Sequence, residues 1–236
     1  MRLRLVSWNI HSCVGTDKRY DPARIADVLA KLDADIIGLQ EVDWRSPSHE
    51  GVDQLAFLAR ELGMTAVAGP NLYDHRGEFG NALLTRLAVQ EVEHLDLAQT
   101  GREPRGCIDA RLRHDDQTIR ALVTHLGLRR AERAAQLRAI ADYLGPSEPG
   151  LVQCLMGDIN EWFPARMMRG PLVPTCFEAV CAPRTFPSRS PTLALDRVMI
   201  SPRPNSIDGD RIGTPLARLA SDHLPVVVDA AWDLAT

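Results

Sequence analysis

Apolar residues along this chain recur mainly in short runs of strand length, separated by polar and turn-forming residues. Period-two alternation or a continuous apolar run of four to eight residues indicates a half-buried or buried β-strand. Ten segments fit this description: Leu3–Ile10, Asp35–Gln40, Met64–Ala68, Asn81–Thr85, Val89–Leu95, Cys107–Arg113, Thr118–Thr124, Leu151–Gly157, Leu195–Ile200 and Leu224–Ala230.

Helical spacing occurs at only three places. Asp21 and Pro22 supply an N-cap and an N1 proline, and apolar residues then recur every three or four positions up to Leu32. A second helix is predicted around Leu55 to Leu62, and a third begins near Arg129. With strands so numerous and helices so few, we expect two packed, mainly antiparallel sheets flanked by helices, since a doubly wound parallel sheet needs a helix after nearly every strand.

The length and composition are consistent with a single catalytic domain over residues 1–236. The chain has 45% hydrophobic residues, no linker and no apolar run long enough to cross a membrane. The first residues alternate directly into a strand without the apolar segment of a signal peptide, so a cytoplasmic location is the default expectation. No obligate protein partner is predicted.

Charge and cysteine content restrict the partners and the kinds of structural site that we expect. The net charge is -4, and Lys18 and Lys31 are the only lysines, which mildly disfavours a nucleic-acid partner without excluding it. The five cysteines are scattered and form no C-x-x-C pair, so neither a disulfide framework nor a structural zinc site is expected.

The last quarter of the chain places a carboxylate and an imidazole at strand ends. Asp196 lies in Leu195-Asp196-Arg197, and His223 lies in Ser221-Asp222-His223-Leu224-Pro225. An aspartate that accepts a ring N–H fixes the histidine tautomer and stabilises the imidazolium formed on proton abstraction. His223 is therefore predicted to be a general base and Asp196 the residue that orients it.

Oxygen-bearing side chains end three other predicted strands. Asn9, Glu41, Asp158 and Asn160 each have an ordinary interpretation alone, as turn residues or as the first polar residue after a buried strand. Together they form the ligand set that a hard divalent cation such as Mg²⁺ or Mn²⁺ prefers.

Seven motifs in order resemble the endonuclease/exonuclease/phosphatase superfamily of deoxyribonuclease I-like hydrolases, with the look of a small bacterial member. They are Ser7-Trp8-Asn9-Ile10, Leu39-Gln40-Glu41-Val42, Gly80-Asn81-Ala82-Leu83-Leu84-Thr85-Arg86, Thr124-His125-Leu126, Gly157-Asp158-Ile159-Asn160, Leu195-Asp196-Arg197-Val198 and Ser221-Asp222-His223-Leu224-Pro225. The resemblance implies a four-layer α/β/β/α sandwich and metal-dependent hydrolysis of phosphoesters, most often phosphodiesters.

The resemblance also implies residue roles. Glu41 resembles the principal metal ligand, and Asn9, Asp222 and Asp158 would be direct or water-mediated ligands. Asp158 and Asn160 resemble the pair that positions the attacking water and the phosphate. His125 and Asn81 would reach the phosphate, leaving His223 as the base oriented by Asp196.

The substrate stays open between nucleic acid and a phospholipid or small phosphorylated molecule. Trp162 and Phe163, with Met167 and Met168, would place apolar bulk near the cleft, although packing is the favoured interpretation for them. His11 is expected at a loop surface. Five arginines indicate either a phosphate-binding rim or a solvated helix start: Arg102, Arg105, Arg129, Arg130 and Arg133. The alternative to an enzyme is a non-catalytic binding module on the same scaffold.

Overall fold

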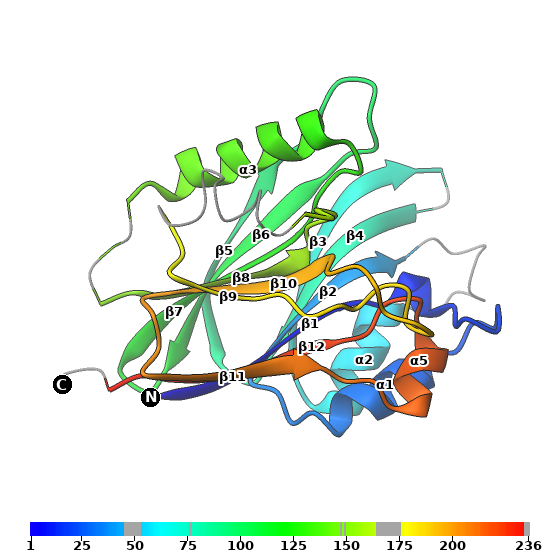
Figure 1. The fold of residues 1–236 in the computed structure, drawn as a ribbon, viewed down its shortest axis with the longest axis horizontal. Helices are drawn as coiled ribbons and strands as arrows, with labels where there is room; N and C mark the ends of the chain where they lie inside the picture. The colour runs from blue at the N-terminus through cyan, green and yellow to red at the C-terminus, as the bar shows by residue number, and fades with distance from the viewer. Residues whose placement is uncertain (45–52, 76, 147, 149, 164–175, 234–236) are drawn as a thin grey trace.

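The computed structural model describes residues 1–44, 53–75, 77–146, 148, 150–163 and 176–233. Within them, twelve strands form two six-stranded sheets (Figure 1). The first sheet has the order β11 (Ser206–Arg211), β12 (Val226–Ala231), β1 (Arg2–Asn9), β2 (Ile36–Asp43), β4 (Gly77–Thr85) and β3 (Thr65–Asp74). The second has the order β5 (Ala88–Asp96), β6 (Gly106–His114), β7 (Gln117–His125), β8 (Val152–Asp158), β10 (Asp196–Ser201) and β9 (Ala179–Cys181).

Strand pairing is mainly antiparallel, as predicted. Two neighbouring pairs are parallel: β1 with β2 in the first sheet, and β7 with β8 in the second. All ten predicted strands are present, with ends that differ by a few residues. In a parallel pair the carboxyl ends of both strands lie at the same edge, so each sheet brings two such ends together.

Helices cover the outer faces of both sheets, and the fold is a four-layer α/β/β/α sandwich (Figure 1). The first sheet packs against α1 (Pro22–Ala30), α2 (Gln54–Leu62) and α5 (Pro215–Ala220), through an apolar cluster that includes Trp8, Ile25 and Leu58. The second sheet packs against α3 (Arg130–Leu144). Asp21 caps α1 by accepting a hydrogen bond from the backbone N–H of Arg24, as its position before Pro22 predicts.

The inner faces of the sheets pack directly on each other through a second apolar cluster. Gly38 on β2 permits a close approach of the two sheets, because a Cβ there would lie 3.1 Å from Cβ of Met156 and 3.1 Å from Cγ2 of Val123. A larger side chain at this position would push β2 away from β7 and β8. Since these strands end in candidate site residues, tight packing fixes the site.

Two strands and two short helices were not predicted. The residues of β11 are mostly exposed and include two aspartates and a glycine, so they carry neither the apolar alternation nor the composition of a strand. β9 has only three residues, and η1 (His11–Cys13) and α5 are single short turns. No helix in the described part of the chain combines the length and apolarity needed to span a membrane.

Candidate active site

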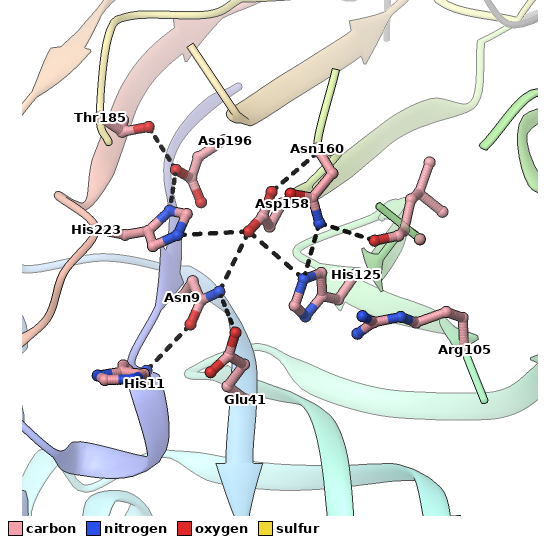
Figure 2. A network of polar contacts seen from close by, with 12 residues as sticks. Asn9, His11, Glu41, Arg105, His125, Asp158, Asn160, Thr185, Asp196 and His223 are labelled. Carbon is pink, nitrogen blue, oxygen red and sulfur yellow. Dashed lines mark hydrogen bonds and ion pairs between the residues drawn. The ribbon is translucent and has the colours of Figure 1, made fainter. Parts of the chain in front are cut away.

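Side chains from both sheets converge at one end of the sandwich, where β1, β2, β7 and β8 finish (Figure 2). Asn9 ends β1, Glu41 lies near the end of β2, His125 ends β7 and Asp158 ends β8. Asp196 begins β10 opposite Asp158, because these two residues pair across the antiparallel ladder. The predicted convergence of strand-end residues is therefore observed.

Asn9 joins the two sheets at this point. Its Nδ2 donates to Oε1 of Glu41 at 2.9 Å and to Oδ2 of Asp158 at 3.2 Å, while its Oδ1 accepts from the backbone N–H of His11 at 3.0 Å. The amide is 1% exposed. One buried amide thus fixes the separation of two carboxylates that belong to different sheets.

Glu41 adopts an unusual backbone conformation. Its φ is 58°, and it lies in a bulge where the pairing of β2 with β4 shifts register between Leu39 and Val42. A bulge redirects the side chain that it carries, and a left-handed conformation at a non-glycine residue costs free energy. The strained backbone of Glu41 therefore lies where its carboxylate accepts a hydrogen bond from Asn9. Asn160, with a φ of 54°, is a second such residue at the site.

Asp158 lies at the centre of the cluster. Its Oδ2 is 3.5 Å from Nε2 of His125 and 3.6 Å from Nε2 of His223, and its Oδ1 accepts from the backbone N–H of Asn160 at 3.0 Å. The adjacent Gly157 makes room for this arrangement, since a Cβ there would lie 2.1 Å from the carbonyl oxygen of Thr124. Asp158 is 2% exposed, so its charge acts through protein rather than through water.

His223 and Asp196 form a buried pair. Nδ1 of His223 is 2.8 Å from Oδ2 of Asp196, and the same oxygen accepts a hydrogen bond from Oγ1 of Thr185. The ring of Phe186 packs on the imidazole at a centroid distance of 4.8 Å. Trp8 on β1 anchors the same segment, because its Nε1 donates to the backbone oxygen of His223 at 2.9 Å. These contacts fix both the tautomer and the ring orientation.

The charges around His223 favour its protonated form. Burial by itself lowers the pKa of His223, but Asp196, through charge and hydrogen bond, and then Asp158 and Asp222 outweigh burial and raise the pKa to about 10. Burial raises the pKa of the Glu41 carboxyl, an effect that the amide of Asn9 partly offsets.

His125 behaves in the opposite way. Burial lowers the pKa of His125 to about 3, Asp158 opposes this shift, and the positive charge of Arg105 adds to it. Nδ2 of Asn160 lies 3.1 Å from Nε2 of His125 and also donates to the backbone oxygen of Leu126 at 2.9 Å. An imidazole that accepts from Asn160 at Nε2 is neutral and carries its hydrogen on Nδ1.

Asn81 and Asp222 are placed at the edge of the cluster. Nδ2 of Asn81 donates to the backbone oxygen of Gly106 at 3.0 Å, so this amide supports the start of β6. Asp222 is partly exposed, and its Oδ1 lies 3.9 Å from Nδ1 of His11. His11, expected at a loop surface, is also partly exposed, but its backbone N–H supports Asn9 and its ring lies beside the site.

A pocket of about 510 Å³ opens beside the cluster and is lined by Glu41, His125, Asp158, Asn160 and His223. Its remaining walls are largely apolar and include Leu72, Phe79, Leu128, Trp162, Phe186 and Leu195. Leu128 is 74% exposed and Trp162 is 58% exposed. The packing interpretation of Trp162 and Phe163 is wrong, because Phe163 is also 54% exposed. Met167 and Met168 lie outside the described residues.

The five arginines, expected either at a phosphate rim or at a solvated helix start, do not all line the pocket beside the cluster. Arg133 is a structural residue, since its Nη1 donates to the backbone oxygen of Leu128 at 2.6 Å and its Nη2 to Glu161 at 3.1 Å. Arg102, Arg129 and Arg130 are exposed. Arg105 alone lines the pocket beside the cluster. Sequence reasoning did not separate Arg105 from its neighbours. The segment Thr185-Phe186-Pro187-Ser188 resembles small bacterial members of the family, but the sequence alone assigned no role to Thr185.

The donor set fits a hard divalent cation. Carboxylate oxygens of Glu41, Asp158 and Asp222 and the amide oxygen of Asn9 are the ligand types that Mg²⁺ and Mn²⁺ take. Burial, and to a smaller extent the charge of Asp222, raises the pKa of Glu41, and a bound cation would favour the charged form of this carboxyl. Ligand atoms of Asp158, Asp196 and His223 also lie within 4.8 Å of one another. Both ring nitrogens of His223 already face carboxylates, however, so this group favours a proton over a metal ion.

A larger groove of about 640 Å³ lies between β1, β11 and β12 and is lined by charged residues. Two of its three arginines form ion pairs: Arg4 with Asp229 at 2.7 Å and Arg86 with Asp33 at 2.6 Å. Among the described residues that line this groove, there is no histidine and no buried carboxylate. The chemistry of this chain therefore points to the smaller pocket.

Comparison with known proteins identifies the family of this chain. The sequence profile described as "Endonuclease/Exonuclease/phosphatase family" matches residues 6–223. YbhP of Escherichia coli K12, an uncharacterized protein, is 29% identical over 246 residues, which span 94% of each chain.

Solved structures show the same fold. An endonuclease/exonuclease/phosphatase from Beutenbergia cavernae is 22% identical, with a TM-score of 0.76 over 98% of this chain and 72% of that one. A humanized D. rerio TDP2 is 21% identical, with a TM-score of 0.71 over 97% of this chain and 98% of that one. The matched profile covers all the strands that carry the cluster, from Asn9 to His223. The chain belongs to the endonuclease/exonuclease/phosphatase family.

Proposed function

We propose that this protein is a divalent-metal-dependent hydrolase of phosphoester bonds, most often phosphodiesters, and that Mg²⁺ or Mn²⁺ is its cofactor. The observation that carries the proposal is the buried chain of contacts from Glu41 through Asn9 and Asp158 to His223 and Asp196. It joins an oxygen ligand set and a histidine–aspartate pair at one pocket. A binding module on this scaffold would have no need to bury so much unbalanced charge.

Each part of the cluster has a distinct proposed role. Glu41, with Asn9, Asp222 and Asp158, would hold the cation, which supplies neutralisation of the phosphoryl charge when bound. Asp158 and Asn160 would position the attacking water, and a neutral His125 would donate from Nδ1 to a phosphate oxygen. The donor of Asn81 is engaged by Gly106, so we propose that Asn81 supports the phosphate site through the backbone of β6 rather than by direct contact.

His223 is proposed as the base, oriented by Asp196. A base must be neutral before it accepts a proton, whereas the surrounding carboxylates hold His223 protonated. Neutralisation of the negative charge of Asp158 and Asp222 would weaken the electrostatic stabilisation of the imidazolium. The proposal therefore couples the readiness of His223 to the neutralisation of Asp158 and Asp222.

The substrate class stays open between nucleic acid and a phospholipid or small phosphorylated molecule. The apolar walls of the pocket favour a phosphoester that carries an apolar group next to the phosphorus. Arg105 is the pocket's arginine, whereas a site that tracks a polynucleotide uses several phosphate contacts.

The test is hydrolysis of an aryl phosphodiester by the purified protein with added Mg²⁺ or Mn²⁺. We expect activity that a chelator abolishes and that Glu41→Ala and His223→Ala each remove. Glu91→Ala, an exposed carboxylate on β5, is the matched control and is expected to retain activity. Undiminished hydrolysis in both site variants would exclude the proposed function.

A further inference from the structure

Arg105 is a buried cation whose hydrogen-bonding capacity is only partly used. The residue is 6% exposed, and its Nη1 lies 3.2 Å from Oε1 of the exposed Glu103. Its Nε is fully buried and has no hydrogen-bond partner among the described residues. Leaving a buried donor unpaired is costly, and a charged donor most of all. Within the described part of the chain, this donor is therefore left without an acceptor.

The segment around Arg105 is held in place from three sides. The backbone N–H of Leu97 donates to the carbonyl oxygen of Arg105 at 2.9 Å. Nδ2 of Asn71 donates to the carbonyl oxygen of Pro104. On the other side, the carbonyl oxygen of Gly106 accepts from Asn81 and from Oγ1 of Thr124, each at 3.0 Å. Such support fixes the backbone from which the guanidinium of Arg105 extends.

The side chain of Arg105 lines the pocket of the candidate active site. Arg105 lines this pocket together with His125 and Asp158, and Figure 2 shows its side chain beside His125. Its charge is felt by the imidazole of His125. Half of the residues that line this pocket are apolar, and they would partly shield a bound anion from water. This shielding would strengthen the contact between the anion and the guanidinium.

From this geometry we infer that Arg105 is a phosphate-binding residue that donates to an anionic oxygen of the substrate's phosphoryl group. A guanidinium presents several N–H donors in one plane, which suits the oxygens of a phosphoryl group. The inference rests on the proposed function for the identity of the substrate. The site itself is defined by a buried guanidinium that lines the pocket together with His125 and Asp158, and it is independent of which group acts as base.

The test compares Arg105→Gln, Arg105→Lys and Arg102→Gln with the unchanged protein. An aryl phosphodiester is the substrate, and inorganic phosphate is both a competitive inhibitor and a calorimetric ligand. Arg105→Gln is expected to raise KM and to weaken phosphate binding by roughly 10- to 100-fold, because a charge-assisted hydrogen bond is lost. Arg105→Lys retains the charge and should recover part of that loss, which also covers the case in which the glutamine variant folds poorly. Arg102→Gln removes an exposed arginine from the same loop and should leave both quantities unchanged.

Glu103→Gln separates substrate binding from a structural ion pair. If Arg105 served only to pair with Glu103, the Glu103→Gln and Arg105→Gln variants would show the same defects. If Arg105 binds phosphate, removal of the competing carboxylate lowers KM or leaves it as it was. Equal phosphate affinity in the Arg105→Gln and Arg102→Gln proteins would overturn the inference while hydrolysis by the unchanged protein still stood. Arg105-dependent phosphate binding without hydrolysis would support the inference and reject the proposed function.

Discussion

His125 and His223 lie on opposite sides of Asp158, and the comparison between them shows what sets a histidine's chemistry. Each places Nε2 at nearly the same distance from Oδ2 of Asp158, 3.5 Å for His125 and 3.6 Å for His223. Both are buried, at 7% and 5% exposure. Yet the pKa of His125 falls to about 3, and the pKa of His223 rises to about 10.

The difference comes from the second neighbour of each ring. His223 has Asp196 at its other nitrogen, whereas His125 has the amide of Asn160 and the positive charge of Arg105 nearby. A shared carboxylate does not therefore decide protonation. The second sheet supplies a neutral histidine from β7, and the segment before β12 supplies a charged one, so the two rings suit different tasks at one phosphate.

The largest expected effect distinguishes the tasks of the two rings. His223→Gln should lower kcat by about 10²- to 10⁴-fold, the range expected for loss of a positioned general base. His125→Gln should lower it by only about 10- to 100-fold, because one hydrogen bond to the phosphate is lost. Steady-state kinetics on an aryl phosphodiester with saturating Mg²⁺ measures both. Equal losses in the two variants would mean that the protonation difference has no catalytic role.

A smaller effect is expected when only the second neighbour of His223 changes. Asp196→Asn removes the charge that orients and protonates the ring, and we expect kcat to fall by about 10- to 100-fold. Thr185→Val leaves the carboxylate and removes only one hydrogen bond to it, so its effect should be several-fold at most. The ratio of the two kcat values measures how much of the effect belongs to the charge. A larger loss from Thr185→Val than from Asp196→Asn would contradict this account.

The two histidines should also give metal-free stability opposite pH dependences. His223, with its pKa raised from 6.5 to about 10, stabilises the fold fully below pH 6.5 and loses that stabilisation as the pH rises toward 10. His125, with its pKa lowered from 6.5 to about 3, makes the fold lose stability as the pH falls from 6.5 toward 3. Each contribution is on the order of 1 kcal/mol or more, since one pKa unit corresponds to about 1.4 kcal/mol.

Urea unfolding in chelator measures this contrast against the matched glutamine variants. The free-energy advantage of the unchanged protein over His223→Gln should shrink from pH 6.5 to 9.5. The free energy of unfolding of the unchanged protein, relative to that of His125→Gln, should decrease as the pH falls from 6.5 to 4.5. Parallel pH profiles for the two variants would show that burial, rather than the second neighbour, controls both rings.

The residues at strand ends could be predicted from the sequence because their positions carry a pattern. Asn9 and Asp158 each end an apolar run, and two sheets packed face to face bring such ends together. The pairing of His223 with Asp196 could be predicted for the same reason, since each lies where a strand begins or is about to begin. Local pattern thus predicts which residues meet at the site.

Protonation and loop chemistry could not be predicted in this way. Arg105 precedes β6 in a polar loop and differs from the exposed Arg102 in its burial and in lining the pocket, and the loop around it is held by Asn71 and Asn81 from other strands. The same limit explains why Trp162 was expected to pack. Its exposure follows from the loop after β8, where no periodicity indicates the direction of a side chain.

The smallest expected effect concerns the apolar side of the pocket, away from either histidine. Trp162 lines the pocket, whereas its neighbour Phe163 is similarly exposed and does not line it. If the walls bind an apolar group of the substrate, Trp162→Ala should raise KM by roughly 2- to 5-fold through lost apolar contact and leave kcat nearly unchanged. Phe163→Ala, matched in exposure, should leave both constants near their original values. A KM that rises equally in the two variants would indicate that exposed aromatic surface acts outside the pocket, and a fall in kcat for Trp162→Ala would place this side chain at the reacting phosphate beside the two histidines.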